Sequence, residues 1–149
     1  MSRVKATPPA VHNINYHLVW IPKYRKSILR GGMKERLKET FSEIAKQYEF
    51  EIEEMSVQKD HVHLFVSAPP RYSPRSLANI LKSISSRKMM EEFPILKRHL
   101  WLGKLWARGY YVGTSGDKVT ADEIKKYIRY YQRHTEQLEL FTKGTKEPH

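Results

Sequence analysis

Apolar and polar residues follow one another in blocks that predict both strands and helices. Residues 15–21 are apolar at nearly every position, which predicts a strand covered on both faces. Residues 33–48 carry apolar side chains at helical spacing and predict an amphipathic helix. Residues 51–57 alternate and predict an edge strand, and a short turn leads from them into a strand over 59–66. These last two strands are expected to form a hairpin.

The second half of the chain predicts three more elements. Ser73 is placed to cap a helix over residues 73–90, with proline at its first position. Residues 105–113 predict a fourth strand, in which Gly109 indicates a bulge or a close backbone approach. Residues 120–138 open on a capping box and predict a last helix.

The resulting order, β-α-β-β-α-β followed by a helix, predicts a ferredoxin-like α+β fold: a four-stranded antiparallel sheet with two helices on one face. The whole chain, residues 1–149, is expected to be one domain, with flexible tails at 1–12 and 142–149. In this topology the first and third strands are central. The strand over 59–66 therefore has one face in the core, and its other face is open unless the last helix or a second subunit covers it.

The amino-acid composition limits the kinds of partner and chemistry that are expected. The chain has 27 Lys and Arg against 16 acids, a net charge of +11, which favours a polyanionic partner such as nucleic acid. It has no cysteine, so disulfides, thiol catalysis and thiolate metal sites are excluded. No apolar run is long enough to span a bilayer and no secretory signal is present, so a cytoplasmic location is expected.

The most informative stretch is Asp60-His61-Val62-His63. Alternate residues of a strand share a face, so His61, His63 and Phe65 should point away from the core. Two neutral imidazoles one strand step apart can hold a divalent cation, completed by an oxygen ligand and water. The alternative is a pair of half-exposed histidines without a metal.

The last helix carries a candidate nucleophile. Tyr127 lies among Lys125, Lys126 and Arg129, cations that favour a phenolate and hold a phosphate. The alternative is that Tyr127 belongs to a core stripe.

Further basic residues are candidate DNA contacts or parts of a solvated surface. Lys82 and Arg87 lie among serines on the helix over 73–90, and Lys23 and Arg25 lie in a basic turn.

Taken together, these residues resemble the single-tyrosine HUH transposases of the smallest insertion sequences (TnpA type), in which HUH stands for histidine, hydrophobic residue, histidine. The resemblance covers about residues 13–134. It is carried by motifs in the same order and spacing: Tyr16-His17-Leu18-Val19-Trp20 with Lys23-Tyr24-Arg25, Asp60-His61-Val62-His63, Leu81-Lys82 with Ser85-Ser86-Arg87, the strand from Trp106 to Gly116, and Ile124-Lys125-Lys126-Tyr127-Ile128.

The resemblance implies a transposase that cleaves and rejoins single-stranded DNA at hairpin-bearing element ends through a 5′-phosphotyrosine, without a nucleotide cofactor. Tyr127 would be the nucleophile, and His61, His63 and Gln132 would hold Mg²⁺ or Mn²⁺. Lys23, Arg25, Lys82, Arg87 and Lys126 would contact DNA. The family's homodimers join sheets edge to edge, and the tyrosine helix completes the partner's histidine site.

One position departs from the family. The glutamine ligand usually follows the tyrosine by four residues, where this chain has Tyr131, and Gln132 comes one later. A π-bulge would re-aim Gln132; otherwise Asp60, His134 or water completes the coordination. Tyr130 and Tyr131 are reserve nucleophiles. Two other functions stay open: a related protein that binds hairpins without cutting them, and a basic RNA-binding sheet domain.

Overall fold

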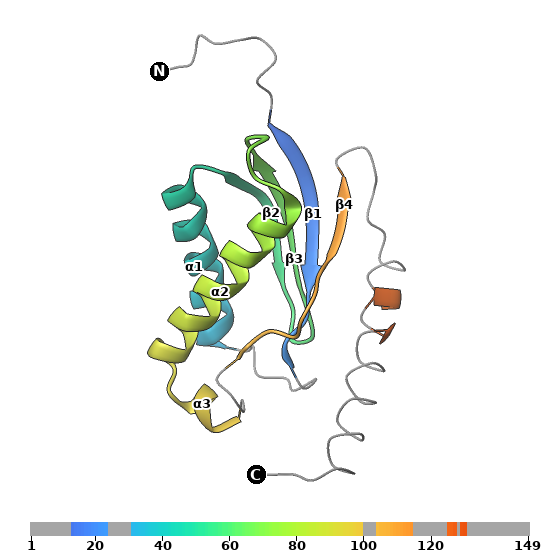
Figure 1. The fold of residues 1–149 in the computed structure, drawn as a ribbon. Coiled ribbons are helices and arrows are strands. Elements are labelled where there is room, and N and C mark those ends of the chain that lie inside the picture. Colours follow the sequence, from blue (N-terminus) through green and yellow to red (C-terminus); the bar gives the residue numbers. More distant parts are fainter. Residues whose placement is uncertain (1–12, 24–30, 100–103, 115–124, 128, 131–149) are drawn as a thin grey trace.

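The computed structural model describes residues 13–23, 31–99, 104–114, 125–127 and 129–130 (Figure 1). Within these ranges the elements are β1 (Ile14–Trp20), α1 (Gly32–Tyr48), β2 (Glu51–Val57), β3 (Val62–Ala68), α2 (Pro74–Glu92), α3 (Ile95–His99) and β4 (Tyr111–Thr114). The order confirms the predicted β-α-β-β-α-β plan. Residues 125–127 and 129–130 are helical as well, and the capping box and both predicted tails lie outside the described residues.

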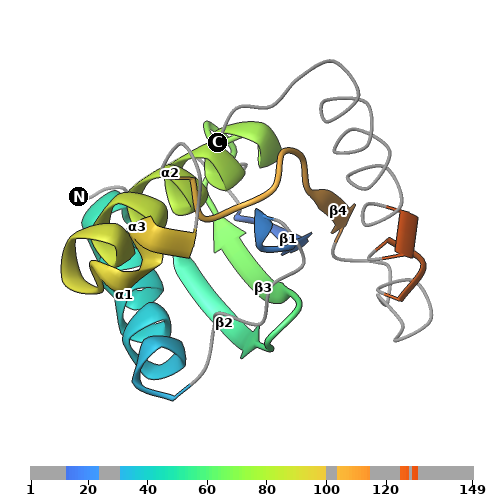
Figure 2. The ribbon, with the colours of Figure 1, turned by 90° about the horizontal axis from the view of Figure 1, so that it is seen from below.

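The four strands form one antiparallel sheet in the order β2-β3-β1-β4. The two central strands pair in register from Ile14 opposite Ala68 to Trp20 opposite Val62. Helices α1 and α2 both cover one face of the sheet, whereas the helical residues 125–127 and 129–130 lie beside β4 on the other side (Figures 1 and 2). The predicted central position of β1 and β3 is therefore confirmed.

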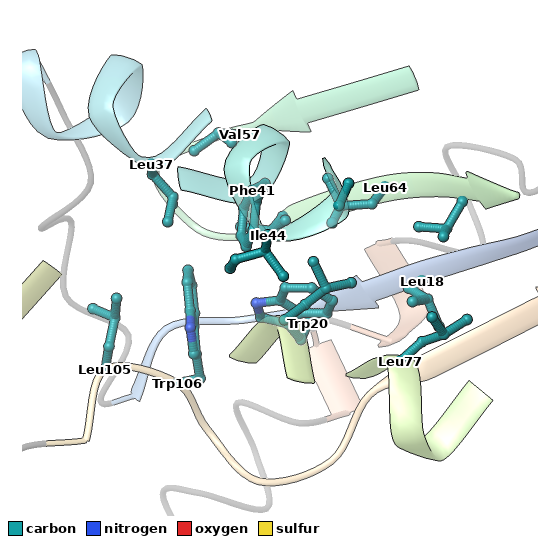
Figure 3. Close-up of a cluster of buried hydrophobic side chains, with 14 of the residues drawn as sticks. Leu18, Trp20, Leu37, Phe41, Ile44, Val57, Leu64, Leu77, Leu105 and Trp106 are labelled. Carbon is teal, nitrogen blue, oxygen red and sulfur yellow. The ribbon is translucent and has the colours of Figure 1, made fainter. Parts of the chain in front are cut away.

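The core lies between the sheet and its two helices (Figure 3). Trp20 from β1 makes edge-on ring contacts with Phe41 of α1 at 5.8 Å and with Trp106 at 5.9 Å between centroids. Leu18 and Leu64 are fully buried on the same face. One face of the two central strands thus lies in this core, whereas His63 and Phe65 on the other face are only half-buried.

The ends of the two long helices follow from their sequences. The Ser73 hydroxyl accepts a hydrogen bond from the backbone N–H of Ser76, the Ser76 hydroxyl accepts one from the N–H of Ser73, and Pro74 takes the first helical position, as predicted. Helix α1 ends at Glu49, which adopts a left-handed conformation with φ 63°. No described helix is long and apolar enough to cross a bilayer.

The predicted fourth strand over 105–113 is wrong in its first half. Only Tyr111–Thr114 pairs with β1, and Trp106 forms an isolated bridge with Pro22. Gly109 has φ 87°, a left-handed conformation that breaks the extended run before the strand begins. Backbone hydrogen bonds from Lys23 to Leu105 and from Ala107 to Ile21 instead tie this segment to the chain that follows β1.

Candidate metal centre

The two faces of β3 separate as the alternation predicts. Val62, Leu64 and Val66 are fully buried, and His63 and Phe65 between them are half-buried on the opposite face. His61 directly precedes the strand, in a tight hairpin where the backbone N–H of Gln58 donates to the carbonyl of His61. The predicted hairpin is confirmed. His63 and Phe65 share a face as predicted, but the strand begins at Val62 and not at residue 59, so strand alternation does not place His61.

Asp60 orients the first imidazole. Its carboxylate oxygen Oδ1 lies 2.9 Å from Nδ1 of His61, and a carboxylate can only accept there, so Nδ1 carries the proton. This leaves the Nε2 lone pair of His61 for a ligand, the carboxylate–histidine arrangement typical of metal sites. The His61 side chain is 17% exposed, enough for a small ion or a phosphate to reach it.

The second imidazole faces a third histidine that the sequence analysis did not select. Nε2 of His63 lies 3.0 Å from Nδ1 of His17, a β1 residue whose ring stacks on Phe65 at 4.4 Å and 22°. Burial, and then the charges of His17 and His61, lower the pKa of His63, which favours the neutral imidazole that a metal needs. Residues 15–21 were expected to be covered on both faces, but His17 is half-exposed.

The donors fit a divalent cation in their chemistry. The lowered pKa of His63 favours its neutral imidazole, and His61 lies next to it with Asp60 bonded to its Nδ1. Among the residues that the structure describes, no three or more histidine or acidic side chains form a ready-made metal cage. Gln132 and His134, the sequence candidates for a third ligand, lie outside the described residues.

Tyr127 lies on the same side of the sheet as the histidines. Its ring packs against Ile21 and Ala107, and its centroid is 6.1 Å from that of Tyr111 on β4. Tyr111 pairs with Val19, and Val19 pairs with His63, so all three point to one face. His63 and Tyr111 are two strands apart, about 10 Å between their Cα atoms from ordinary strand spacing.

Two other tyrosines differ from Tyr127 in their surroundings. Tyr130 is 62% exposed, and Tyr131 lies outside the described residues. The centre of the face is not open, because Val19 is fully buried between His63 and Tyr111. Sequence reasoning had allowed for a cover over this face.

The predicted DNA-contacting cations have different environments. Arg87 and Lys126 are exposed, and Arg25 lies outside the described residues. Burial and the charge of Lys104 lower the pKa of Lys23. Lys82 is half-buried, and its ammonium donates to the carbonyls of Ala107 at 2.9 Å and Gly109 at 2.7 Å.

The serines near Lys82 do not form a phosphate-facing row. The buried Ser85 hydroxyl accepts from Nε1 of Trp106 at 2.9 Å, and the Ser86 hydroxyl accepts from the backbone N–H of Leu105 at 3.2 Å. Both serines of α2 therefore form hydrogen bonds with the segment that precedes β4.

Fold and site together define a class: a ferredoxin-like α+β domain with a His-hydrophobic-His pair on a central strand and a helix-borne tyrosine over the same face. Residues 10–131 match the family model described as "Transposase IS200 like". The chain belongs to the IS200-like transposase family.

Relatives agree with this assignment. The chain is 39% identical over 118 residues to the ISDra2 transposase TnpA of Deinococcus radiodurans, covering 79% of this chain and 84% of that one. It is 34% identical over 118 residues to the transposase of insertion sequence element IS200 from Salmonella typhimurium, covering 79% and 76%.

Solved structures show the same fold. A crystal structure of a transposase from Deinococcus radiodurans aligns with TM-score 0.77 and 34% identity, covering 86% of this chain and 98% of that one. A REP-associated tyrosine transposase bound to a REP hairpin aligns with TM-score 0.53 and 14% identity, covering 88% and 70%. The second likeness concerns the fold alone.

Proposed function

We propose that this transposase cleaves and rejoins single-stranded DNA at insertion-sequence ends, with Tyr127 as nucleophile and a divalent cation on His61 and His63. One observation carries the proposal. Through Tyr111 and Val19, the Tyr127 ring and the His63 imidazole belong to one row of side chains on one face of the sheet. A phenol and a histidine pair that can hold a cation, both aimed at the same surface, suit attack on a phosphodiester.

In the cleavage step the Tyr127 phenol loses its proton and its oxygen attacks the scissile phosphorus. The bond from phosphorus to the 3′ oxygen breaks, that oxygen takes up a proton, and the 5′ phosphate stays on the tyrosine. A divalent cation, Mg²⁺ or Mn²⁺, would offset the charge that builds on the phosphate oxygens. Rejoining is the reverse attack by a 3′ hydroxyl, so the ester bond is conserved and no nucleotide cofactor is required.

The third ligand in this proposal is Gln132, as the family resemblance implies, with His134, Asp60 and water as its rivals. Asp60 already bonds Nδ1 of His61, so it supports the proposal better as an orienting group than as a ligand.

The nucleic-acid partner is single-stranded DNA carrying hairpins. A net charge of +11 supports binding to the phosphate backbone, with the exposed Arg87 and Lys126 as contacts beside Lys23, Arg25 and Lys82. A neighbour of the same fold is described as bound to a REP hairpin, which makes hairpin DNA the first probe to try. We propose a homodimer acting in the cytoplasm, and light scattering of the purified protein tests the assembly.

The decisive experiment uses a hairpin-bearing single strand labelled at its 3′ end, because the labelled fragment stays on the protein after cleavage. Wild-type protein with Mn²⁺ should give a covalent adduct on a denaturing gel, and EDTA should abolish it. Tyr127→Phe should give none while still binding the hairpin, and Tyr130→Phe, at an exposed position, should keep it.

Three results would contradict this proposal. An adduct from Tyr127→Phe would place the nucleophile elsewhere. Cleavage that persists in EDTA would exclude a divalent cation from the mechanism. Tight hairpin binding by wild-type protein with no adduct under any metal would favour the non-cleaving alternative.

A further inference from the structure

We propose that Lys82 is a positioning residue for the nucleophile: it holds the backbone of residues 107–109 in the place where Ala107 packs against the Tyr127 ring. This inference rests on the proposed function, because it concerns the tyrosine that attacks DNA. It gives Lys82 a role besides the DNA contact already proposed for it, and the test below separates the two roles.

The ammonium of Lys82 is bonded to the backbone of one short segment. Its Nζ lies 2.9 Å from the carbonyl oxygen of Ala107 and 2.7 Å from that of Gly109. An ammonium has three N–H donors, so this segment uses two of them. Hydrogen bonds from a charged donor are stronger than those between neutral groups. Lys82 therefore ties two carbonyls of this segment to α2.

The segment depends on such bonds because it lies outside the sheet. The pairing of β4 with β1 begins only at Tyr111, and Gly109 before it has a left-handed backbone with φ 87°. Ala107 is held from two sides: its N–H donates to the carbonyl of Ile21 at 2.9 Å, and its own carbonyl accepts from Lys82. Without the ammonium, the bond to residue 21 would hold this peptide from one side only.

Ala107 connects this brace to the nucleophile. Ala107 and Ile21 are both buried, and the Tyr127 ring packs against the cluster that they form. The Tyr127 hydroxyl oxygen is buried as well. Ile21 directly follows β1, at the end of the sheet where β3 begins and where His61 lies. A shift of Ala107 would therefore move the Tyr127 ring relative to the histidine pair, and small shifts of a reacting group cost rate.

The test compares full-length wild-type protein with Lys82→Met, Lys82→Arg, Ala107→Gly and the double variant Lys82→Met/Ala107→Gly. Methionine keeps a side chain of similar length without the ammonium, whereas arginine restores a cation with several N–H donors. Burial lowers the pKa of Lys82 to about 8, so the assays are run at pH 7, where the ammonium prevails.

Two quantities are measured for each protein. Fluorescence anisotropy in EDTA gives the affinity for hairpin-bearing single-stranded DNA. Single-turnover adduct formation with Mn²⁺ and saturating DNA gives the rate constant of cleavage, at a temperature where circular dichroism shows every variant folded. Leu37→Ala, at a fully buried position of α1, controls for lost stability, and Lys46→Met, at an exposed position, controls for lost charge.

We expect the rate constant of Lys82→Met to fall about 10- to 100-fold at saturating DNA. Lys82→Arg should recover part of that loss. Ala107→Gly should also be slower than wild-type protein, and the double variant should be no slower than Lys82→Met, because both substitutions act on one contact. Leu37→Ala and Lys46→Met should stay within about twofold of the wild-type rate constant.

A rate constant for Lys82→Met within about twofold of wild type would overturn the inference, and weaker hairpin binding beside it would leave Lys82 as a DNA contact only. Effects that multiply in the double variant would also overturn it, since Lys82 would then act independently of Ala107. So would an equal loss in Leu37→Ala, because lost stability would explain the slow rate. In all three cases wild-type protein still forms the Tyr127 adduct, and the proposed function stands. No adduct from wild-type protein, or an adduct from Tyr127→Phe, would contradict both proposals.

Discussion

The buried ammonium of Lys82 should make the unfolding free energy of the protein depend on pH. Its ammonium donates to the carbonyls of Ala107 and Gly109, and Ala107 in turn packs against Tyr127. Burial lowers the pKa of Lys82 to about 8 in the folded protein. The perturbation is Lys82→Met, which keeps a side chain of similar length and removes the titrating group.

The sign of the effect follows from proton binding. An unfolded lysine titrates near 10.4, so between about pH 8 and pH 10 the unfolded chain holds a proton that the folded chain has released. The unfolding free energy contributed by Lys82 should therefore rise with pH across this window, by at most about 1.4 kcal/mol per pH unit. Over the full window the gain is at most about 3 kcal/mol, and below pH 8 the contribution is flat.

The assay is urea unfolding of wild-type protein and Lys82→Met at pH 7, 8, 9 and 10. All other groups titrate in both proteins, so the difference between the two curves isolates Lys82. The unfolding free energy of wild-type protein minus that of Lys82→Met should rise as the pH increases from 8 to 10. Lys46→Met, at an exposed position on α1, should show no such gain. A difference curve for Lys82→Met that is flat, or that falls with pH, would refute the reasoning.

Three further predictions concern the two faces of β3. Leu64→Ala should cost about 2–5 kcal/mol in urea unfolding, because Leu64 is fully buried in the core; a smaller loss would mean that the site collapses around the gap. Asp60→Asn should weaken Mn²⁺ binding about 10- to 100-fold, because the carboxylate no longer fixes His61; unchanged calorimetry would show that Asp60 is not an orienting group. In metal-free protein, NMR should give His63 a pKa below the ordinary histidine value, and His17→Phe should raise it because one neighbouring positive charge is lost; no change would contradict the contact.

The sequence predicted most of the fold because the required signals are local. Alternation within residues 59–66 separated a core face from a site face, and the serine and proline at residues 73 and 74 marked the start of α2. The order of elements then limited the topology to a sheet with β1 and β3 in the centre, which is the order observed.

Features that depend on contacts between distant residues were not predicted. The sequence pattern over residues 105–113 predicts a strand, but the left-handed conformation of Gly109 interrupts it. The Lys82 ammonium also donates to carbonyls in this segment, 25 and 27 residues away along the chain. Ser85 lies among the basic residues of α2, but its hydroxyl accepts a hydrogen bond from the Trp106 indole. Neither arrangement has a signature in the local sequence.

His17 was missed for a related reason. It lies in a run of apolar residues, and its face is evident only once β1 is set in register with β3. A signal was nevertheless present: once both strands were assigned to the centre of one antiparallel sheet, a polar residue between buried neighbours had to lie on the face away from α1 and α2.

The two faces of β3 carry different kinds of side chain, one packed in the core and one turned to the candidate site. Because the core lies on one face, side chains on the other can be chosen for ligation and still be held rigidly by the buried residues between them. His17 and His63 come from the two strands that are paired on both edges, so the β1–β3 ladder fixes their spacing and the ladders to β4 and β2 hold the two strands in place. Tyr127 approaches from outside the sheet, against Tyr111 at the β4 edge. In the proposed mechanism, a cation held on the rigid sheet and a tyrosine on a separate element would suit a reaction in which the same phosphate is attacked, held and then released to a different strand.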